Sequence, residues 1–422
     1  MHLAFIFGRT PQLSRQELES VATILPFQWS LHSVQPNIVR LNPEGDYSQV
    51  SILKNGVQSE ELLKVVDRTG YLQEWLGGTL KIVWLEEAVT RDGIADSALR
   101  LISALQKDTE GKRTIGISTY DKSVSPFRLG MEIKKKLRTE GGAVRIVLRT
   151  EGQELSSAQI LHNKLTLAEG DAANLELNVL HEGEKYWIGV TLTSQDIEAY
   201  TKRDFGIPKP DPVSGMLPPK LAKAMINLAA RAEHVAVYDP FCGNGRVLIE
   251  AAAVGMQVYG SDIEPKKIEA AKENLEWLDD QQSSSAMSAE CWVGDATLPT
   301  APALLRHTCP SDFVIVCEPY LGKPLRVPLK PEEKEAWLAD LIPLYEAFLT
   351  VWSEVPSPDR PKRMIIVFPR VKVADATEAS VYDVLVDSIA RLGYDSKRRF
   401  TYDRPDSLIR RDLIFIEYRI DK

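Results

Sequence analysis

The apolar and polar positions change their pattern about halfway along the chain. From residue 217 onward, short apolar runs alternate with segments of helical spacing at 221–232, 246–255 and 265–278. This alternation predicts an α/β domain with a mostly parallel sheet covered by helices on both faces. The runs at 397–402 and 413–420 predict an antiparallel end to that sheet.

The first 200 residues show a less regular pattern. Residues 1–94 predict a small α+β unit, in which Ser14 and Glu17 have the spacing of a capping box that begins a helix. Residues 95–200 predict a second α+β segment. Residues 201–216 are rich in proline, which element interiors exclude, so we interpret them as a linker that also packs against the following site. The last domain then spans 217–422.

Composition narrows the class of protein. Among 422 residues, 44% are apolar and 26% charged, as in globular proteins, and no apolar run reaches the ~20 residues that a membrane span needs. The first residues lack the pattern of a signal peptide. The four cysteines form no CxxC pair and the six histidines no HxxxH pair, so we expect no metal, no disulfide framework and a cytoplasmic location.

The charge distribution points to a polyanionic partner. The whole chain carries a net charge of −8, yet residues 100–150 carry +7. A basic region within an acidic protein is typical of phosphate contact, although a solvated helix face gives the same pattern. The basic residues of the predicted helix at 127–142 are the candidates: Lys134, Lys135, Lys136 and Arg138.

Acidic residues end four successive predicted strands. The strand-end sequences are DPFCGNG from Asp239, SDIEP around Asp262, GDAT around Asp295, and CEPY around Glu318. A single acidic residue at a strand end commonly starts a turn or caps a helix. Because the carboxyl ends of parallel strands meet at one edge, where such sheets bind ligands, the four together predict a site.

The residue types suggest a ligand with a positive charge. Gly243 and Gly245 let the backbone approach a ligand closely, but Leu248 replaces the third glycine of a dinucleotide fingerprint, which disfavours an oxidoreductase. Asp239 would repel a phosphate. Asp262 is placed to accept hydrogen bonds from ribose hydroxyls and Asp295 from an adenine amino group. An adenosine with a cationic tail describes S-adenosylmethionine.

These motifs resemble those of Rossmann-like amino methyltransferases. Together with GMLPPKLAKAMINLA before them, they resemble one subgroup, the THUMP-domain tRNA guanosine-N2 methyltransferases of the guanosine-10 type. LGMEIKKKLRTEGGAVRIVL and ELSSAQILHNKL resemble the THUMP module, preceded by a ferredoxin-like unit. The resemblance implies that 95–200 bind tRNA, and that the last domain methylates a guanine amine with S-adenosylmethionine. The sequence does not indicate an accessory protein subunit, and it does not exclude one.

The resemblance also implies residue roles. It assigns the cofactor to Asp239, Cys242, Gly243, Asn244, Gly245, Asp262 and Asp295. The family ends its fourth strand in Asp-Pro-Pro-Tyr, where this chain has Cys317-Glu318-Pro319-Tyr320. We expect Glu318 and the carbonyl of Pro319 to accept the N–H groups of the target amine and Tyr320 to stack on the base.

Other interpretations remain open at this point. Cys317 would serve as a nucleophile in pyrimidine C5 methylation, but the neighbouring carboxylate disfavours a thiolate, and we interpret it as a small buried residue. A second alternative is a methyltransferase that acts on another base amine, in rRNA or DNA. A third alternative is a tRNA-binding protein without catalytic activity, which the complete set of predicted cofactor residues disfavours.

Overall fold

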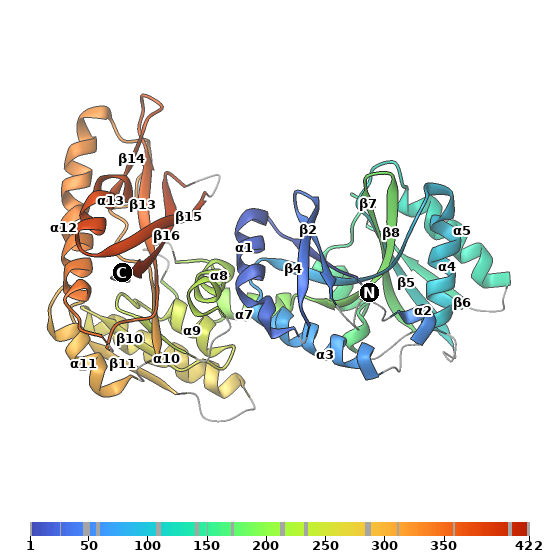
Figure 1. The fold of residues 1–422 in the computed structure, drawn as a ribbon, viewed down its shortest axis with the longest axis horizontal. Helices are drawn as coiled ribbons and strands as arrows, with labels where there is room; N and C mark the ends of the chain where they lie inside the picture. Colours follow the sequence, from blue (N-terminus) through green and yellow to red (C-terminus); the bar gives the residue numbers. More distant parts are fainter. Residues whose placement is uncertain are drawn as a thin grey trace. The chain divides into compact units, whose positions relative to one another are not determined.

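The computed structural model describes residues 2–419 except 26, 45–50, 56–59, 107–110, 140–142, 150, 170–172, 212–215, 232–234, 283–287, 310–311, 358 and 404–406. The chain forms two compact units, Met1–Ala199 and Tyr200–Lys422 (Figure 1).

The first unit is an α+β unit built on one sheet. Among the described residues its strand order is β2-β3-β1-β4-β8-β7-β5-β6. The strands are β1 (His2–Phe7), β2 (Trp29–Gln35), β3 (Ile38–Pro43), β4 (Thr79–Val89), β5 (Lys112–Thr119), β6 (Ala143–Val147), β7 (Asn174–Glu182) and β8 (Lys185–Ser194). The helices are α1 (Pro11–Val21), α2 (Ile52–Asn55), α3 (Glu60–Trp75), α4 (Ile94–Leu105), α5 (Pro126–Thr139) and α6 (Ser157–His162).

This sheet joins the two predicted segments 1–94 and 95–200. Strand β4 of the first pairs with β8 of the second. A buried ion pair also links them, since Lys81 Nζ on β4 lies 2.5 Å from Glu176 Oε1 on β7. The hydroxyls of Ser118 and Thr191 donate to the same carboxylate. The two segments therefore form one compact unit, and their identity as a ferredoxin-like unit and a THUMP module stays a prediction.

The predicted capping box at Ser14 is wrong. Helix α1 begins at Pro11, whose fixed φ favours the first helical position, so Ser14 lies inside the helix. Its hydroxyl donates to Thr10 O at 2.9 Å. Glu17 accepts hydrogen bonds from the backbone N–H groups of Gly77 and Gly78 at 2.7 and 2.9 Å, and so anchors the loop before β4.

The second unit has the predicted Rossmann-like fold. Its sheet runs β11-β10-β9-β12-β13-β16-β15, with β14 beside β13, and the pairings from β11 to β13 are parallel. The strands are β9 (Ala236–Asp239), β10 (Val258–Asp262), β11 (Ala289–Val293), β12 (Phe313–Cys317), β13 (Met364–Lys372), β14 (Glu378–Ser380), β15 (Tyr394–Tyr402) and β16 (Ile409–Tyr418). Strands β15 and β16 form the predicted antiparallel end.

Helices cover both faces of this sheet. The helices after the first unit are α8 (Pro219–Ala230), α9 (Arg246–Ala252), α10 (Pro265–Gln281), α11 (Thr300–Thr308), α12 (Lys334–Ser353) and α13 (Val381–Arg391), and α7 (Ile197–Phe205) precedes them across the boundary between the two units. Figure 1 shows α12 and α13 along one face, with α8 and α9 on the other. The central strands β9 and β12 are buried throughout, which is why their sequences are continuous apolar runs.

Strand order reverses between β9 and β12. The chain leaves β9 toward β10 and β11 on one side, whereas β12 pairs with the other side of β9. A crevice forms at such a switch point because the two connections diverge.

The predicted linker begins as helix and continues as the wall of that crevice. Helix α7 covers 201–205, and residues 212–215 lie outside the described part. Asn274 Oδ1 accepts a hydrogen bond from Lys209 N at 2.8 Å, and Lys267 Nζ lies 2.5 Å from Asp211 Oδ2. Asp211 and Met216 of this segment also line the cavity at the strand ends, and the role of 201–216 as a linker stays a prediction.

Candidate active site

A cavity of about 520 Å³ opens at the carboxyl ends of β9, β10, β11 and β12. All four acidic strand ends line it, namely Asp239, Asp262, Asp295 and Glu318. Cys242, Gly243, Asn244, Pro319 and Tyr320 line it as well, whereas Gly245 does not. The fold thus brings strand-end motifs from four separate parts of the sequence into one site.

The loop after β9 is a tight turn that exposes its backbone to the cavity. Gly243 and Gly245 have φ angles of +51° and +87°, which residues with a side chain rarely adopt. A Cβ placed on Gly243 would meet no atom within 4 Å, so the cavity lies directly beside this backbone. A Cβ placed on Gly245 would instead lie 3.3 Å from the Cβ of Ala271 on α10, so the role of Gly245 is to let the helix approach the loop.

Asp262 holds this loop through its carboxylate. Oδ2 accepts from Gly243 N and Oδ1 from Glu264 N, both at 2.9 Å. Each oxygen retains a second lone pair, so one carboxylate fixes the turn and still presents two acceptors to the cavity.

Asp295 lies half-buried after β11 and is held by a local turn. Its Oδ1 accepts from Thr297 N at 2.9 Å and from Thr297 Oγ1 at 2.6 Å. Because both bonds fall on Oδ1, they orient the side chain without engaging Oδ2.

Asp239 creates the electrostatic character of the cavity. It is almost fully buried and accepts a hydrogen bond from Phe241 N at 2.9 Å. Burial raises the pKa of this carboxyl well above its ordinary value, and the negative charges of Asp262 and Glu318 raise it further. A cation bound beside Asp239 would relieve this cost, so the cavity favours a positively charged ligand.

The fourth strand end carries Glu318 in an ion pair that sequence reasoning missed. Arg411 of β16 donates from Nε to Oε1 at 2.5 Å and from Nη2 to Oε2 at 3.4 Å. The signal available in the sequence is an arginine pair, Arg410 and Arg411, at the charged start of an apolar strand.

Pro319 and Tyr320 differ in exposure. Pro319 is buried, and the Tyr320 ring is 50% exposed on the cavity wall. The hydroxyl of Tyr345 donates to the Tyr320 carbonyl at 3.2 Å, which fixes the backbone below that ring.

The cysteines are poor nucleophiles. Cys317 is fully buried, and its burial, with the charges of Asp239 and Glu318, raises the pKa of the thiol well above its usual value. Burial also raises the pKa of Cys242. The interpretation of Cys317 as a small buried residue agrees with this environment, and Cys242 lines the cavity as an apolar group.

Asn244 has a structural contact beside its place on the cavity wall. Its Nδ2 donates to Lys209 O at 2.9 Å, and its backbone carbonyl accepts from Asn274 Nδ2 at 2.8 Å. The side chain therefore ties the segment before the domain to the loop after β9, a contact that its motif position does not reveal.

The basic residues assigned to RNA lie on α5 in the first unit. Lys135 and Arg138 are exposed and Lys134 is half-buried. Lys136 is already paired, with Asp96 Oδ1 at 2.8 Å and Glu132 Oε1 at 3.6 Å, and the hydrogen bond to Asp96 raises the pKa of its ammonium. Lys134, Lys135 and Arg138 are thus better placed for phosphate contact than Lys136.

In the described part of the chain, no cluster of His, Cys, Asp and Glu side chains has the arrangement of a metal site. Nor does any described helix combine the length and apolar character that crossing a membrane requires.

Known proteins resemble this chain in sequence and in fold. Residues 209–292 match the UPF0020 family model, described as RMKL-like, methyltransferase domain. The chain is 30% identical over 158 residues to tRNA (guanine(10)-N2)-dimethyltransferase of Pyrococcus abyssi, covering 35% of this chain and 45% of that protein. It is 29% identical over 154 residues to tRNA (guanine(6)-N2)-methyltransferase of Thermus thermophilus, covering 32% and 44%. The chain thus spans less than half of each relative's length.

The solved structure of TrmN from Thermus thermophilus shares the fold, with a TM-score of 0.50 and 17% identity over 99% of both chains. The resemblance to a methyltransferase family, predicted from the strand-end motifs, is confirmed.

Proposed function

We propose that this chain, whose second unit contains a methyltransferase domain of the UPF0020 type, methylates the exocyclic N2 amine of a guanosine in tRNA. The observation that carries the proposal is the convergence of Asp239, Asp262, Asp295 and Glu318 on one cavity at the switch point of the sheet. Names of relatives that act on guanine 10 and guanine 6 of tRNA support the substrate class, and we favour guanosine 10.

The cavity residues fit S-adenosylmethionine, which, when bound, supplies an electrophilic methyl group. Asp262 offers two oxygens to the ribose hydroxyls and Asp295 one oxygen to the adenine amine. Gly243 leaves room for a ligand against its backbone, and Asp239 places a buried carboxyl where a cationic tail would be stabilised. The same carboxyl would disfavour a pyrophosphate.

The fourth strand end fits the acceptor amine. The lone pair of a guanine N2 is delocalised into the ring, so the amine is a weak nucleophile. Glu318 and the Pro319 carbonyl would accept its two N–H groups, which stabilises the positive charge that develops on nitrogen. The half-exposed ring of Tyr320 is available to stack on a base turned out of its helix.

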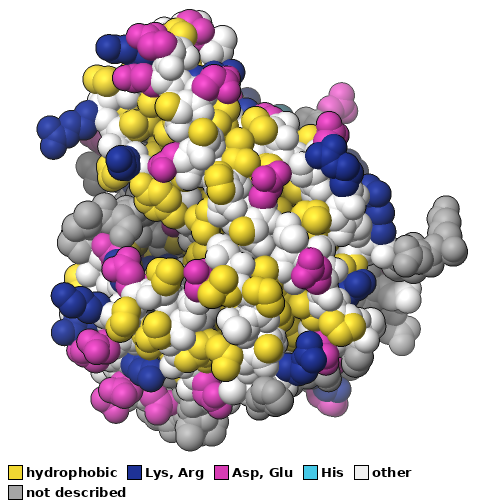
Figure 2. Space-filling view, turned by 90° about the vertical axis from the view of Figure 1, so that its left-hand side faces the viewer, with side chains coloured by type: hydrophobic (Ala, Val, Ile, Leu, Met, Phe, Trp, Pro, Cys, Tyr) yellow, Lys and Arg dark blue, Asp and Glu magenta, His cyan; other side chains and the backbone are white. Residues whose placement is uncertain are grey.

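Basic side chains suit the approach of RNA. Lys134, Lys135 and Arg138 lie on α5 of the first unit. In the second unit, Lys323 and Arg326 are exposed on the segment after Tyr320 that lines the cavity. Figure 2 shows one face on which many apolar side chains lie among acidic and basic ones. Lys323 and Arg326 are our candidates for RNA contact beside the cavity.

A methyl-transfer assay tests the proposal. The protein is incubated with labelled S-adenosylmethionine and tRNA transcripts in which guanosine 10 or guanosine 6 is replaced by inosine, which lacks only the exocyclic amine. We expect label in the unmodified transcript and its loss with one inosine substitution. Transfer to rRNA or DNA alone would favour another base amine as the target. Cofactor binding without transfer to any nucleic acid would favour a non-catalytic tRNA-binding protein.

A further inference from the structure

Glu318 is held in place by a side chain from the far part of the sheet. Arg411 contacts both carboxylate oxygens through two different nitrogens, at 2.5 and 3.4 Å. The arginine side chain is only 8% exposed and that of Glu318 17%, so water competes little for either partner. Such a two-point arginine–carboxylate contact fixes the plane of the carboxylate as well as its position.

A glutamate needs this support more than an aspartate would. Its side chain has one further methylene and one further rotatable bond, and ordering a glutamate costs up to ~2 kcal/mol of side-chain entropy. A catalytic acceptor that is displaced by ~1 Å loses about a hundredfold in rate. A contact that restricts the longer glutamate side chain would therefore help Glu-Pro-Tyr to perform the role of Asp-Pro-Pro-Tyr.

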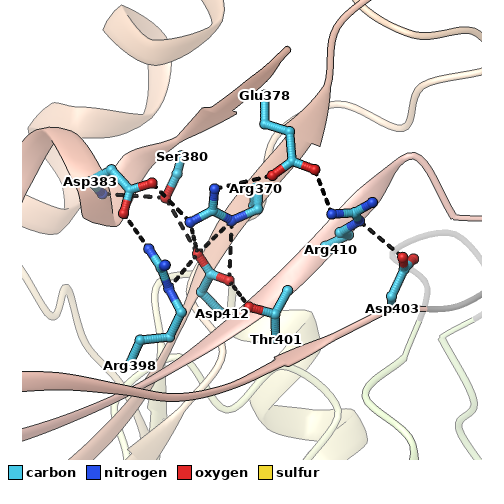
Figure 3. A network of polar contacts seen from close by, with 9 residues as sticks. All are labelled: Arg370, Glu378, Ser380, Asp383, Arg398, Thr401, Asp403, Arg410 and Asp412. Carbon is cyan, nitrogen blue, oxygen red and sulfur yellow. Dashed lines mark hydrogen bonds and ion pairs between the residues drawn. The ribbon is translucent and has the colours of Figure 1, made fainter. Parts of the chain in front are cut away.

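The strand that delivers Arg411 is itself held on its other face. Asp412 is fully buried, and its carboxylate accepts from Arg370 Nε at 3.0 Å and from Thr401 Oγ1 at 2.7 Å (Figure 3). Arg410 on the same strand pairs with Glu378 at 2.5 Å and Asp403 at 3.0 Å. Figure 3 shows Arg410 and Asp412 in one connected network that links β13, β14, β15 and β16.

The geometry of β16 explains how this network fixes the position of Arg411. Successive side chains of a strand point to opposite faces, so Arg410 and Asp412 enter the network while Arg411 lies between them and reaches Glu318. Ion pairs on both flanking residues keep the strand from shifting, since a slip of one residue would exchange the faces.

We propose that Arg411 is a positioning residue, which holds the Glu318 carboxylate in the cavity wall and acts on the target base only through it. This inference rests on the proposed methyl transfer. Neither oxygen of Glu318 is saturated by one arginine bond, because a carboxylate offers two lone pairs on each oxygen. The pair therefore leaves Glu318 able to accept an amine N–H while the arginine fixes its direction.

A double-mutant cycle tests the role. The variants are Arg411→Met, Glu318→Gln and the double variant, with kcat and KM for tRNA and the Kd for S-adenosylmethionine measured for each. We expect Arg411→Met to lower kcat by about 10- to 100-fold with little change in cofactor Kd. In the Glu318→Gln background the same change should cost no more than about threefold, because its target is already lost. Arg411→Lys should recover part of the rate.

A matched control separates positioning from stability. Arg363 is another buried arginine of this unit, and it donates from Nε to Ala229 O at 2.6 Å, away from the residues that line the cavity. Arg363→Met and Arg411→Met should both lower the melting temperature, because each removes a buried arginine. Arg363→Met should nevertheless leave kcat within about threefold of the wild-type value. If both variants lower kcat alike, or if the losses from Arg411→Met and Glu318→Gln multiply, Arg411 has only a structural role.

The outcomes also separate this inference from the proposed function. An active wild-type enzyme with multiplying losses rejects the positioning role alone. A wild-type protein that transfers no methyl group to any nucleic acid rejects both, because no catalytic carboxylate then exists to be positioned.

Discussion

Asp239 is the most buried of the four acidic side chains that line the cavity. Its carboxylate accepts a hydrogen bond from Phe241 N and faces two further acidic groups. Burying this carboxylate beside two acidic groups costs folding free energy, which a cationic ligand would offset. Gly243 makes the complementary contribution, because its missing side chain leaves the space that the ligand would fill.

Asp239→Asn should stabilise the protein without cofactor while weakening its binding. Burial raises the folded-state pKa of this carboxyl above its unfolded value, so the stability that it contributes is present below the unfolded pKa, near 4, and is lost as pH rises through the raised pKa. In the ligand-free protein at about pH 8 we expect a melting temperature a few degrees higher for Asp239→Asn. Thermal unfolding from about pH 5 to 9, with and without S-adenosylmethionine, checks this. An unchanged pH profile would mean that Asp239 is not costly in the folded state.

Gly243→Ala should weaken cofactor binding by more than about tenfold, because the added methyl group enters the space beside the loop. Gly255 provides a matched control. It has a φ of +80° and open space where a Cβ would lie, but it does not line the cavity. An alanine at either position incurs a similar backbone strain of about 1–2 kcal/mol. Calorimetric titration with S-adenosylmethionine should therefore show a loss for Gly243→Ala only, and equal losses would count against the assigned binding mode.

Among the elements, β16 combines an apolar core segment with a charged segment. Its apolar half, Leu413–Ile416, is buried in the core of the second unit, while its first half carries the charged triplet Arg410, Arg411 and Asp412. Asp412 is buried among arginines that it neutralises. Removing one member of a buried charge network leaves the others uncompensated, so this element should be sensitive to single substitutions.

Asp412→Asn should destabilise the second unit by about 3–5 kcal/mol, because Arg370 and Arg398 lose a buried partner. Asp395→Asn is the comparison on the neighbouring strand. Asp395 is largely exposed and pairs with Arg419 at 2.9 Å, so its loss should cost less than about 1 kcal/mol. Chemical denaturation of both variants measures the difference, and comparable losses would show that the Figure 3 network contributes little.

At the scale of the whole molecule, the cavity and the candidate RNA-binding residues of α5 lie in different compact units. The cavity lies entirely in residues 200–422, whereas the basic helix α5 belongs to residues 1–199. The net charge of −8 makes local basic regions the places where a polyanion would bind.

Replacing Lys134, Lys135 and Arg138 together by alanine should raise the KM for tRNA by about tenfold or more and reduce the salt dependence of binding. The turnover at saturating tRNA should stay near that of the wild type, since these residues lie outside the unit that contains the cavity. Lys136→Ala should have a small effect because Asp96 and Glu132 already pair with that lysine. An unchanged affinity in the triple variant would identify the basic region of α5 as a solvated face.

The sequence by itself determined the fold of the second unit and most of its cavity. Apolar runs marked the parallel strands, and because the carboxyl ends of such strands share an edge, Asp239, Asp262, Asp295 and Glu318 could be placed together in advance. The same reasoning divided the first 200 residues into 1–94 and 95–200 but could not show that the two segments share one sheet, because the pairing of β4 with β8 and the ion pair Lys81–Glu176 depend on contacts between distant segments. It also placed a helix start at Ser14, where the local pattern was outweighed by Pro11.

Only the tertiary structure decided what surrounds the fourth strand end. Arg411 lies 93 residues from Glu318, and no local pattern connects them. Their contact arises because β13 pairs with both β12 and β16, which brings the two residues across one intervening strand. Periodicity records which face of an element is buried, but a polar partner across a sheet is set by strand order and register, and these are properties of the folded chain alone.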